Sequence, residues 1–201
     1  MLIEETPLLT RSVLNTGGKQ MGNGGSSIDA LQELTQEHEA VLSNLVALQQ
    51  VLEGMQRGLA WVDSAALDTA ENVVRALETD LAVHLRKEEE VLFPSLEAYL
   101  GREQGPIGVM LMEHEDLRRI VPMLADALAV LKTGADSVSR QDALQEVLRW
   151  GHGLIGLLRQ HIAKEDQCLF PMAASHMGRS RLLVLGEEMR GIARDAGGHG
   201  E

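Results

Sequence analysis

The chain has 201 residues, of which 44% are hydrophobic and 2% aromatic, which predicts one globular domain with an aliphatic core. Its formal net charge of −12 argues against nucleic acid and anionic membranes as partners, because both carry negative charge. A single cysteine, Cys168, excludes an intramolecular disulfide, and no apolar run is long enough to span a membrane. The start of the chain lacks the pattern of a secretory signal, so we expect a soluble, cytoplasmic protein.

The first segment of the chain is not expected to fold. It ends in TGGKQMGNGG, and this many glycines disfavour a helix. We expect residues 1–26 to be a flexible tail and residues 27–176 to form the folded domain. Residues 177–201 should add a short helix, with the sequence SRLLVLGEEMRGIA, that lies across the domain, followed by a frayed end.

Four amphipathic segments make up the expected domain. In each, apolar side chains recur at intervals of three and four residues, which is the stripe that a helix buries against its neighbours. The stripes run, in chain order, over residues 31–55, 67–91, 107–131 and 144–172. Short polar connections lie around residues 58–64, 101–105 and 133–139. We therefore predict an all-α protein, an antiparallel up-down-up-down four-helix bundle with a short additional C-terminal helix.

The second and fourth segments each contain the sequence Leu-Phe-Pro. Pro94 and Pro171 are expected to end or kink their helices, because proline removes a helical hydrogen bond and crowds the preceding turn. Phe93 and Phe170 are the two phenylalanines of the chain. We expect them to pack as a symmetric hydrophobic pair that keeps bulk water from a nearby site.

Each of the four stripes includes a histidine, and the second and fourth add a glutamate one turn later. The residues are His38, His84, Glu88, His114, His161 and Glu165. A glutamate in a leucine stripe is costly to bury unless it is paired or bound to a metal. At i and i+4 the histidine and glutamate of one helix project side by side, so both can reach one metal, or the carboxylate can bridge two.

The polar residues also follow an internal duplication. QEHEAVL is followed 46 residues later by HLRKEEEVLFP, and MEHEDLR is followed 47 residues later by HIAKEDQCLFP, counting from histidine to histidine. A matched pair of such hairpins predicts a pair of bound metals at a pseudo-twofold centre. Imidazole and carboxylate without thiolate favour iron or manganese, with zinc as a further candidate.

Two other metal motifs are absent from the sequence. No histidine is preceded three residues earlier by glutamate, as in ferritin-like di-iron bundles. The His-Glu-x-x-His motif of zinc proteases fails as well, because Leu42 and Arg118 occupy its last position after the two His-Glu pairs.

The doubled order HE…HxxxE…LFP resembles the hemerythrin family, in the bacterial branch called the HHE cation-binding domain, over about residues 28–176. The resemblance implies two iron ions joined by an oxo or hydroxo bridge. It implies that the terminal iron ligands are His38, His84, His114 and His161. Glu88 and Glu165 would be the bridging carboxylates.

Two features depart from the oxygen-carrying hemerythrins. Those proteins have a second histidine on the third helix, where this chain has Arg118. They also use a His-x-x-x-x-Asp pair, which Asp166 matches; we prefer Glu165 because it lies on the stripe and mirrors Glu88. The ligand count is similar to that of bacterial iron-sulfur-cluster repair proteins, although their cysteine-containing N-terminal region has no counterpart here.

Two classes of function fit the predicted site. The first is a binding or sensing protein that responds to O2, NO or iron itself; the second is an enzyme that reduces NO or peroxide, or donates iron for iron-sulfur cluster repair. An enzyme would also need an electron donor. The sequence offers no acid–base residue beyond the expected ligands, which favours binding or sensing.

Several other residues are expected to lie outside the first coordination shell. GHGLIG, which begins at Gly151, matches a dinucleotide-binding pattern but follows no strand, and His152 lies on the opposite helix face from His161. Glu89 and Glu90 are expected on a solvated surface. Cys168 lies on the stripe one turn after Glu165 and is expected to be a buried, inert thiol.

Overall fold

The computed structural model describes residues 28–58, 64–102, 105–134 and 136–197, and every structural statement below concerns these ranges. All of their regular structure is helical, so the expectation of an all-α protein is confirmed for the described residues. The elements are α1 (Ala30–Gln56), α2 (Ser64–Ala76), η1 (Leu77–Leu81), α3 (Ala82–Lys87), η2 (Glu88–Leu92), α4 (Phe93–Leu100), α5 (Pro106–Thr133), α6 (Ser137–Lys164), η3 (Glu165–Leu169), α7 (Phe170–His176) and α8 (Arg179–Gly197). The expected flexible tail, residues 1–26, lies outside the described residues.

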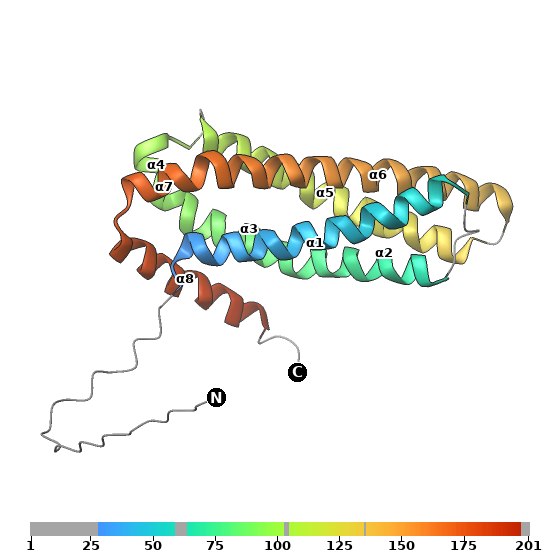
Figure 1. Cartoon of the computed structure of the whole chain (residues 1–201), viewed down its shortest axis with the longest axis horizontal. Coiled ribbons are helices and arrows are strands. Elements are labelled where there is room, and N and C mark those ends of the chain that lie inside the picture. Colours follow the sequence, from blue (N-terminus) through green and yellow to red (C-terminus); the bar gives the residue numbers. More distant parts are fainter. Residues whose placement is uncertain (1–27, 59–63, 103–104, 135, 198–201) are drawn as a thin grey trace, which may run out of the picture.

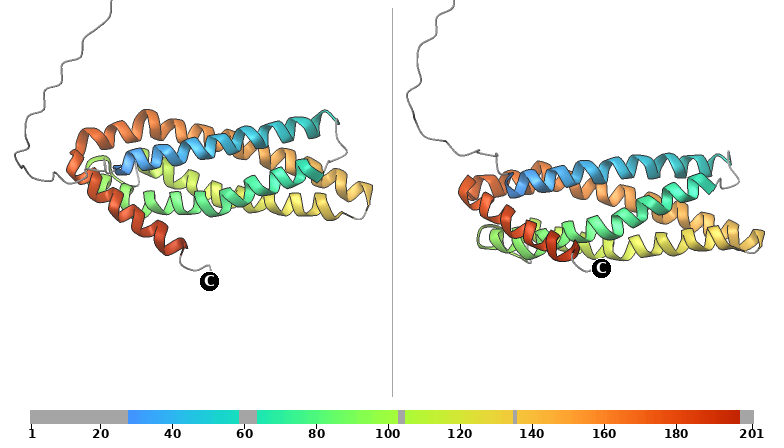
Figure 2. Two further views of the ribbon diagram at one scale, coloured as in Figure 1. Left: turned by 60° about the horizontal axis from the view of Figure 1, so that its bottom comes forward. Right: turned by 90° about the horizontal axis from the view of Figure 1, so that it is seen from below.

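Four long helical segments lie side by side: α1, the run from α2 to α4, α5, and the run from α6 to α7 (Figure 1). The chain direction alternates from each segment to the next, so successive segments are antiparallel (Figure 1). Helix α1 contacts α2 and α6, and α5 also contacts α2 and α6, which places the four segments around a common interior. The turned views show the same grouping, with α8 crossing it at one end (Figure 2).

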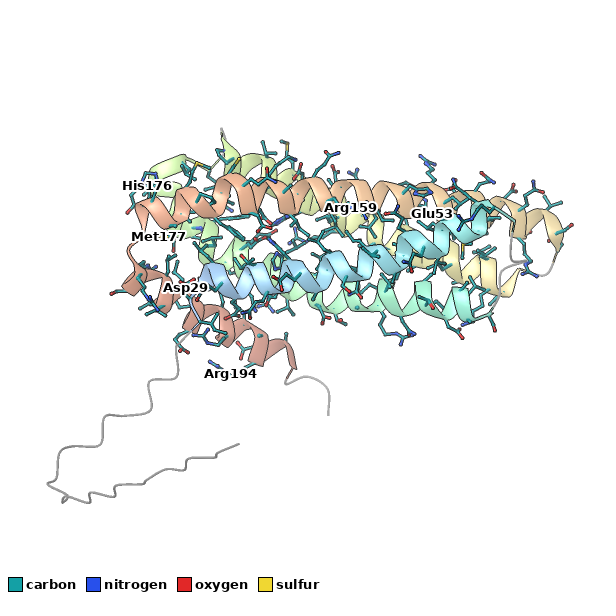
Figure 3. The ribbon with its side chains drawn as sticks, viewed as in Figure 1. Asp29, Glu53, Arg159, His176, Met177 and Arg194 are labelled. Atoms are coloured by element: carbon teal, nitrogen blue, oxygen red, sulfur yellow. The ribbon has the colours of Figure 1, made fainter. Side chains whose placement is uncertain are left out.

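Local signals explain where the helices begin. Asp29, labelled in Figure 3, caps α1: its carboxylate accepts from the backbone N–H groups of Leu31 and Gln32, both at 3.1 Å, and the Gln32 side chain accepts from the Asp29 backbone at 3.2 Å. Asp136 caps α6 through its carboxylate, which accepts from the backbone N–H groups of Val138 and Ser139. Pro106 occupies the first turn of α5, where its missing N–H costs nothing.

The core has two hydrophobic parts, with a polar layer between them. One part, toward the α1–α2 connection, includes Val41 and Leu117; the other, toward α8, includes Leu34 and Met110. His38 and His114 lie in the sequence between these pairs and are themselves buried. The polar residues are therefore surrounded along the helix axes by aliphatic packing that excludes water.

The prolines of the two Leu-Phe-Pro sequences do not end their helices. The preceding turn is instead widened into a π-helix, so that the N–H of Phe93 donates to the carbonyl of Glu88 and the N–H of Phe170 to that of Glu165. A proline in a regular α-helix would clash with the carbonyl four residues earlier, and a wider turn relieves that clash. The helices continue beyond Pro94 as α4 and beyond Pro171 as α7.

The widened turn also moves the buried stripe by one residue. The expectation that Cys168 is buried is wrong: its side chain is exposed. A π-turn brings the fourth residue after Glu165, rather than the third, beneath it, so Leu169 occupies the buried position. Cys168 therefore points to solvent.

The helix expected from SRLLVLGEEMRGIA is present as α8 and is longer at both ends. It packs across the start of α1 through Leu182, Leu185 and Met189, which are buried. Gly186 makes the close approach possible, since a Cβ there would lie 3.1 Å from the backbone nitrogen of Ala30.

Among the described helices, none has the length and apolar character needed to cross a membrane.

Candidate metal centre

The structure brings together the six polar residues singled out in the four stripes. They come from six elements: His38 from α1, His84 from α3, Glu88 from η2, His114 from α5, His161 from α6 and Glu165 from η3. Each is at most 2% exposed. A cluster of histidines and carboxylates buried this deeply needs a specific partner.

The six side chains form two overlapping groups that share both carboxylates. One group is His38, His84, Glu88 and Glu165; the other is Glu88, His114, His161 and Glu165. Within each group, one nitrogen or oxygen atom from every residue lies within 4.8 Å of the others. The arrangement offers two adjacent cation positions, each with two histidines of its own and two carboxylates in common.

Each carboxylate faces histidines from both halves of the chain. Glu88 has Oε1 3.6 Å from Nε2 of His84 and Oε2 3.3 Å from Nε2 of His114. Glu165 has Oε2 3.1 Å from Nε2 of His38 and Oε1 3.4 Å from Nε2 of His161. The two oxygens of each carboxylate therefore point toward different histidine pairs, which is the geometry needed to bridge two cations.

Unsatisfied atoms at the centre test whether a metal fits. Both oxygens of Glu88, both oxygens of Glu165 and Nε2 of His114 and His161 are buried without a hydrogen-bond partner. Buried polar atoms are seldom left this way, because each lost hydrogen bond costs about 1–3 kcal/mol. Carboxylate oxygens and imidazole nitrogens are also the donors that iron and related divalent metals accept. The residues present fit a metal.

The pKa shifts of the two carboxylates also suit a bound cation. Burial and the neighbouring Glu165 charge raise the pKa of Glu88 well above its ordinary value. Burial alone would raise the pKa of Glu165 too, but the close imidazole of His38 and the other nearby imidazoles lower it to about 2. Without a cation, burial and the Glu165 charge therefore favour the protonated form of Glu88, whereas the imidazoles favour the ionised form of Glu165.

Two of the four histidines, His114 and His84, are prepared to act as neutral donors. Burial, together with the charge of His161, lowers the pKa of His114 to about 4. Burial also lowers the pKa of His84, although Glu37 opposes the shift. Burial would lower the pKa of His38 as well, but Glu165 and Asp166 reverse that effect and raise it.

A second ring of carboxylates orients the four imidazoles through their outer nitrogens. The Nδ1 atoms of His84 and His161 lie 2.8 and 3.0 Å from carboxylate oxygens of Glu37 and Glu113. Those of His38 and His114 lie 2.9 and 2.6 Å from oxygens of Asp166 and Glu89. With Nδ1 engaged outside, each Nε2 faces the centre, which is the arrangement in which carboxylates fix metal-binding histidines.

These orienting residues were not singled out by the sequence analysis, apart from Asp166 as an alternative ligand. Glu89 was expected on a solvated surface; it instead accepts from His114, with Arg118 2.7 Å away. The internal duplication of the sequence contained a signal that could have identified these orienting residues. The residue before the first histidine of each half and the residue after the glutamate of each half are acidic in both copies.

Glu165 and Asp166 take different places in the site. The Glu165 carboxylate is fully buried at the centre, whereas the Asp166 side chain is 35% exposed and reaches only the outer face of His38. Of the residues expected outside the centre, His152 is exposed, and Glu90 is exposed and paired with Arg86.

The phenylalanines cover the site by stacking on histidines. Phe170 lies parallel to the ring of His38, with centroids 5.4 Å apart, and Phe93 stacks on His114 at 5.5 Å. Both phenylalanines are buried. Each thus shields one imidazole, and the two positions are related by the internal duplication.

Comparison with protein families matches residues 29–173 to the hemerythrin HHE cation-binding domain. Among curated proteins, the chain is similar to the iron-sulfur cluster repair protein YtfE of Salmonella schwarzengrund (strain CVM19633) and of Salmonella newport (strain SL254). Each is 30% identical over 99 residues, which is 49% of this chain and 44% of the relative. The matched part is thus less than half of each relative. No solved structure matches the chain.

Proposed function

The chain belongs to the hemerythrin HHE cation-binding domain family, and on this premise we propose that it is a non-haem di-iron protein that binds or senses O2, NO or iron. The observation that carries the proposal is the pair of overlapping residue groups that share Glu88 and Glu165. Each shared carboxylate has two buried oxygens without partners, directed at different histidine pairs.

In this proposal the two iron positions have separate terminal ligands. His38 and His84 hold one iron, and His114 and His161 hold the other. Glu88 and Glu165 bridge the two. A bound iron pair would supply redox chemistry and a place for a small gas molecule, because four histidines and two carboxylates would not by themselves fill two iron coordination spheres.

The protein's own residues prepare this centre. The outer carboxylates fix the imidazole orientations, and Phe93 and Phe170 exclude water from His114 and His38. The four long helical segments act as an antiparallel up-down-up-down four-helix bundle, which fixes the ligand-bearing turns on rigid elements. Burial and the Glu165 charge raise the pKa of Glu88 in the metal-free protein, and a bound cation would favour its ionised form.

The second candidate is an enzyme. It would reduce NO or peroxide with electrons from a separate donor, or donate iron for iron-sulfur cluster repair. The observation that favours it is the similarity to the two YtfE proteins, which are named for cluster repair. Among the described residues, the carboxylates next to the proposed ligands are engaged in orienting histidines, so binding or sensing is our preferred proposal.

The proposed partners follow from charge. An acidic chain, with a net charge of −12, suits neither nucleic acid nor an anionic membrane, and we propose that it works in the cytoplasm on a small gas ligand.

Metal analysis tests the proposal first. After anaerobic reconstitution with Fe(II) and removal of excess metal, we expect about two irons per chain. A value below about half an equivalent would refute a di-iron site. Stopped-flow mixing of the reduced protein with O2, NO and peroxide then separates the two candidates, since a stable, reversible adduct indicates binding and catalytic consumption of any of the three indicates an enzyme.

A further inference from the structure

Lys87 is a buried cation one residue before Glu88. Its side chain is 4% exposed, and its ammonium group lies 2.7 Å from Oε1 of Glu33 and also pairs with Glu37, both on α1. The other oxygen of Glu37 accepts from Nδ1 of His84 at 2.8 Å. Because a buried ammonium is costly without partners, Lys87 and the two carboxylates fix one another's positions.

Helix α8 extends this chain of ion pairs. Nη1 of Arg190 lies 2.8 Å from Oε2 of Glu33, the oxygen that Lys87 leaves free, and 3.2 Å from the carbonyl oxygen of Ile28. The close packing of Gly186 on the α1 backbone keeps α8 in place. A continuous series of charged contacts, from Arg190 through Glu33, Lys87 and Glu37, thus joins the C-terminal helix to His84.

The matching residues of the other half lack this support. Lys164, one residue before Glu165, pairs with Glu113, and Glu113 accepts from His161. The Lys164 side chain, however, is 41% exposed, and within the described part of the chain Glu113 is its one ion-pair partner. The equivalent lysines therefore differ: one is buried between two carboxylates and backed by α8, and the other is open to solvent.

The remaining orienting carboxylates add to the asymmetry. Glu89, which orients His114, is paired with Arg118 at 2.7 Å. Asp166, which orients His38, has no lysine or arginine partner among the described residues. The His38 and His84 pair therefore has one orienting carboxylate, Asp166, whose charge no described lysine or arginine balances, and this charge favours a divalent cation there.

A cavity shows why Glu37 needs a fixed partner. Glu37 and His84 line a space of about 480 Å³ between α1, η1 and the C-terminal end of α8. Without Lys87, the carboxylates of Glu33 and Glu37 would repel each other, and Glu37 would have room to turn away from His84.

We propose that Lys87, supported by Glu33 and Arg190, is a positioning residue that makes the His38–His84 metal position the slower to exchange its metal. The inference rests on the proposed function, because it requires two metal positions. It predicts that iron leaves the His114–His161 position first, so the two irons of one site differ in lability.

Release of iron to a chelator tests the inference. The full-length protein, loaded anaerobically with Fe(II), is mixed with excess ferrozine. We expect two phases of similar amplitude. In Lys87→Met the slow phase should become about 10- to 100-fold faster, the range for loss of an orienting partner. The matched variant, Lys164→Met, should leave the slow phase unchanged.

Two further variants separate positioning from folding. Arg190→Ala should accelerate the slow phase. Arg190→Lys should return its rate constant most of the way to the wild-type value, because a cation then still reaches Glu33. Thermal melts of the metal-free variants provide the control for folding. Should Lys87→Met fail to fold, Glu33→Gln, whose amide keeps the size of the side chain, tests the same link.

A spectroscopic measurement checks the positioning role. In Co(II)-loaded protein, Lys87→Met should shift the ligand-field bands of one ion, which a purely structural effect would not do.

The inference is wrong if the wild-type protein releases both irons with one rate constant, or if Lys87→Met and Lys164→Met change the same phase equally. Failure of the proposed function looks different: fewer than two irons would bind before any chelator is added.

Discussion

Asp166 Oδ1 lies 2.9 Å from Nδ1 of His38, although the two residues are 128 positions apart in the sequence. The neighbour of Asp166, Glu165, faces the same imidazole from its inner side, with Oε2 3.1 Å from Nε2. Two adjacent acidic residues of η3 thus contact opposite edges of one ring, one inside the proposed metal centre and the other outside it.

Replacing these two residues should have different effects. In Asp166→Ala the iron site should still fill, but with affinity reduced by about 10- to 100-fold, because His38 loses its orienting partner. In Glu165→Ala both irons should be disturbed, because the carboxylate is shared. Equilibrium titration with Fe(II) under anaerobic conditions measures both effects.

Glu90→Ala is the matched control, since Glu90 is exposed and pairs with Arg86 rather than with a histidine. If Asp166→Ala abolishes iron binding and Glu165→Ala retains it, the ligand on this helix is Asp166 and the proposed assignment is wrong.

The binding of metal should depend on pH in a defined direction. Burial and the Glu165 charge raise the pKa of Glu88, and Glu165 and Asp166 raise the pKa of His38 against the effect of burial, so protons compete with a metal at both groups. The affinity should therefore rise with pH between about pH 6 and pH 8, the range in which histidines titrate. His114, whose pKa is about 4, is already neutral there and adds nothing to the slope.

A weakly buffered solution with a pH indicator provides the measurement: addition of Fe(II) to the metal-free protein at neutral pH should release protons. Glu88→Gln should release fewer, because the amide carries no titrating proton. Metal uptake without proton release would contradict the pKa directions given for the centre.

Phe93 should contribute to both stability and shielding. It is fully buried and stacks on His114, so Phe93→Ala should lower the free energy of unfolding by about 3–5 kcal/mol, the usual cost of such a cavity. The variant should also expose the iron centre to water and speed its oxidation in air. Tyr99→Ala is the control, because Tyr99 is exposed on the next turns of α4.

Chemical denaturation of the metal-free proteins and the rate of air oxidation of the loaded ones check this prediction. Equal stability of Phe93→Ala and the wild-type protein would show that the aromatic ring is not packed as described.

Cys168 should react readily in the native protein. The π-turn after Glu165 directs its thiol to solvent, so a thiol reagent such as DTNB should label it without prior unfolding. Modification should leave iron content unchanged, since the side chain faces away from the centre. Labelling that occurs only in denaturant would mean that the regular α-helical stripe is correct after all.

The sequence predicted the all-α fold because the apolar stripes are local signals. The intervals of three and four residues identified each long helix, and the cost of burying Glu88 and Glu165 identified the polar layer. The four histidines and two glutamates of the stripes do lie together in the structure, whereas their role as metal ligands stays a prediction.

What the sequence did not predict depends on nonlocal packing. The widened turns at Glu88 and Glu165 shift the stripe by one residue, and a regular helical period cannot show this, which is why Cys168 was misplaced. Lys87 and Glu89 resemble the charges of a solvated surface. The burial of Lys87 depends on Glu33 and Glu37 of α1, and the pairing of Glu89 with His114 depends on α5; both helices are distant in the sequence.

The magnetic coupling between the two irons tests the shared Glu88 and Glu165 carboxylates most directly. In the fully loaded, oxidised protein, carboxylates that bridge two ferric ions should couple their spins antiferromagnetically. We predict that the protein gives little EPR signal at low temperature although metal analysis finds about two irons per chain. A strong signal from isolated ferric ions that accounts for the bound iron would contradict a shared, bridged centre.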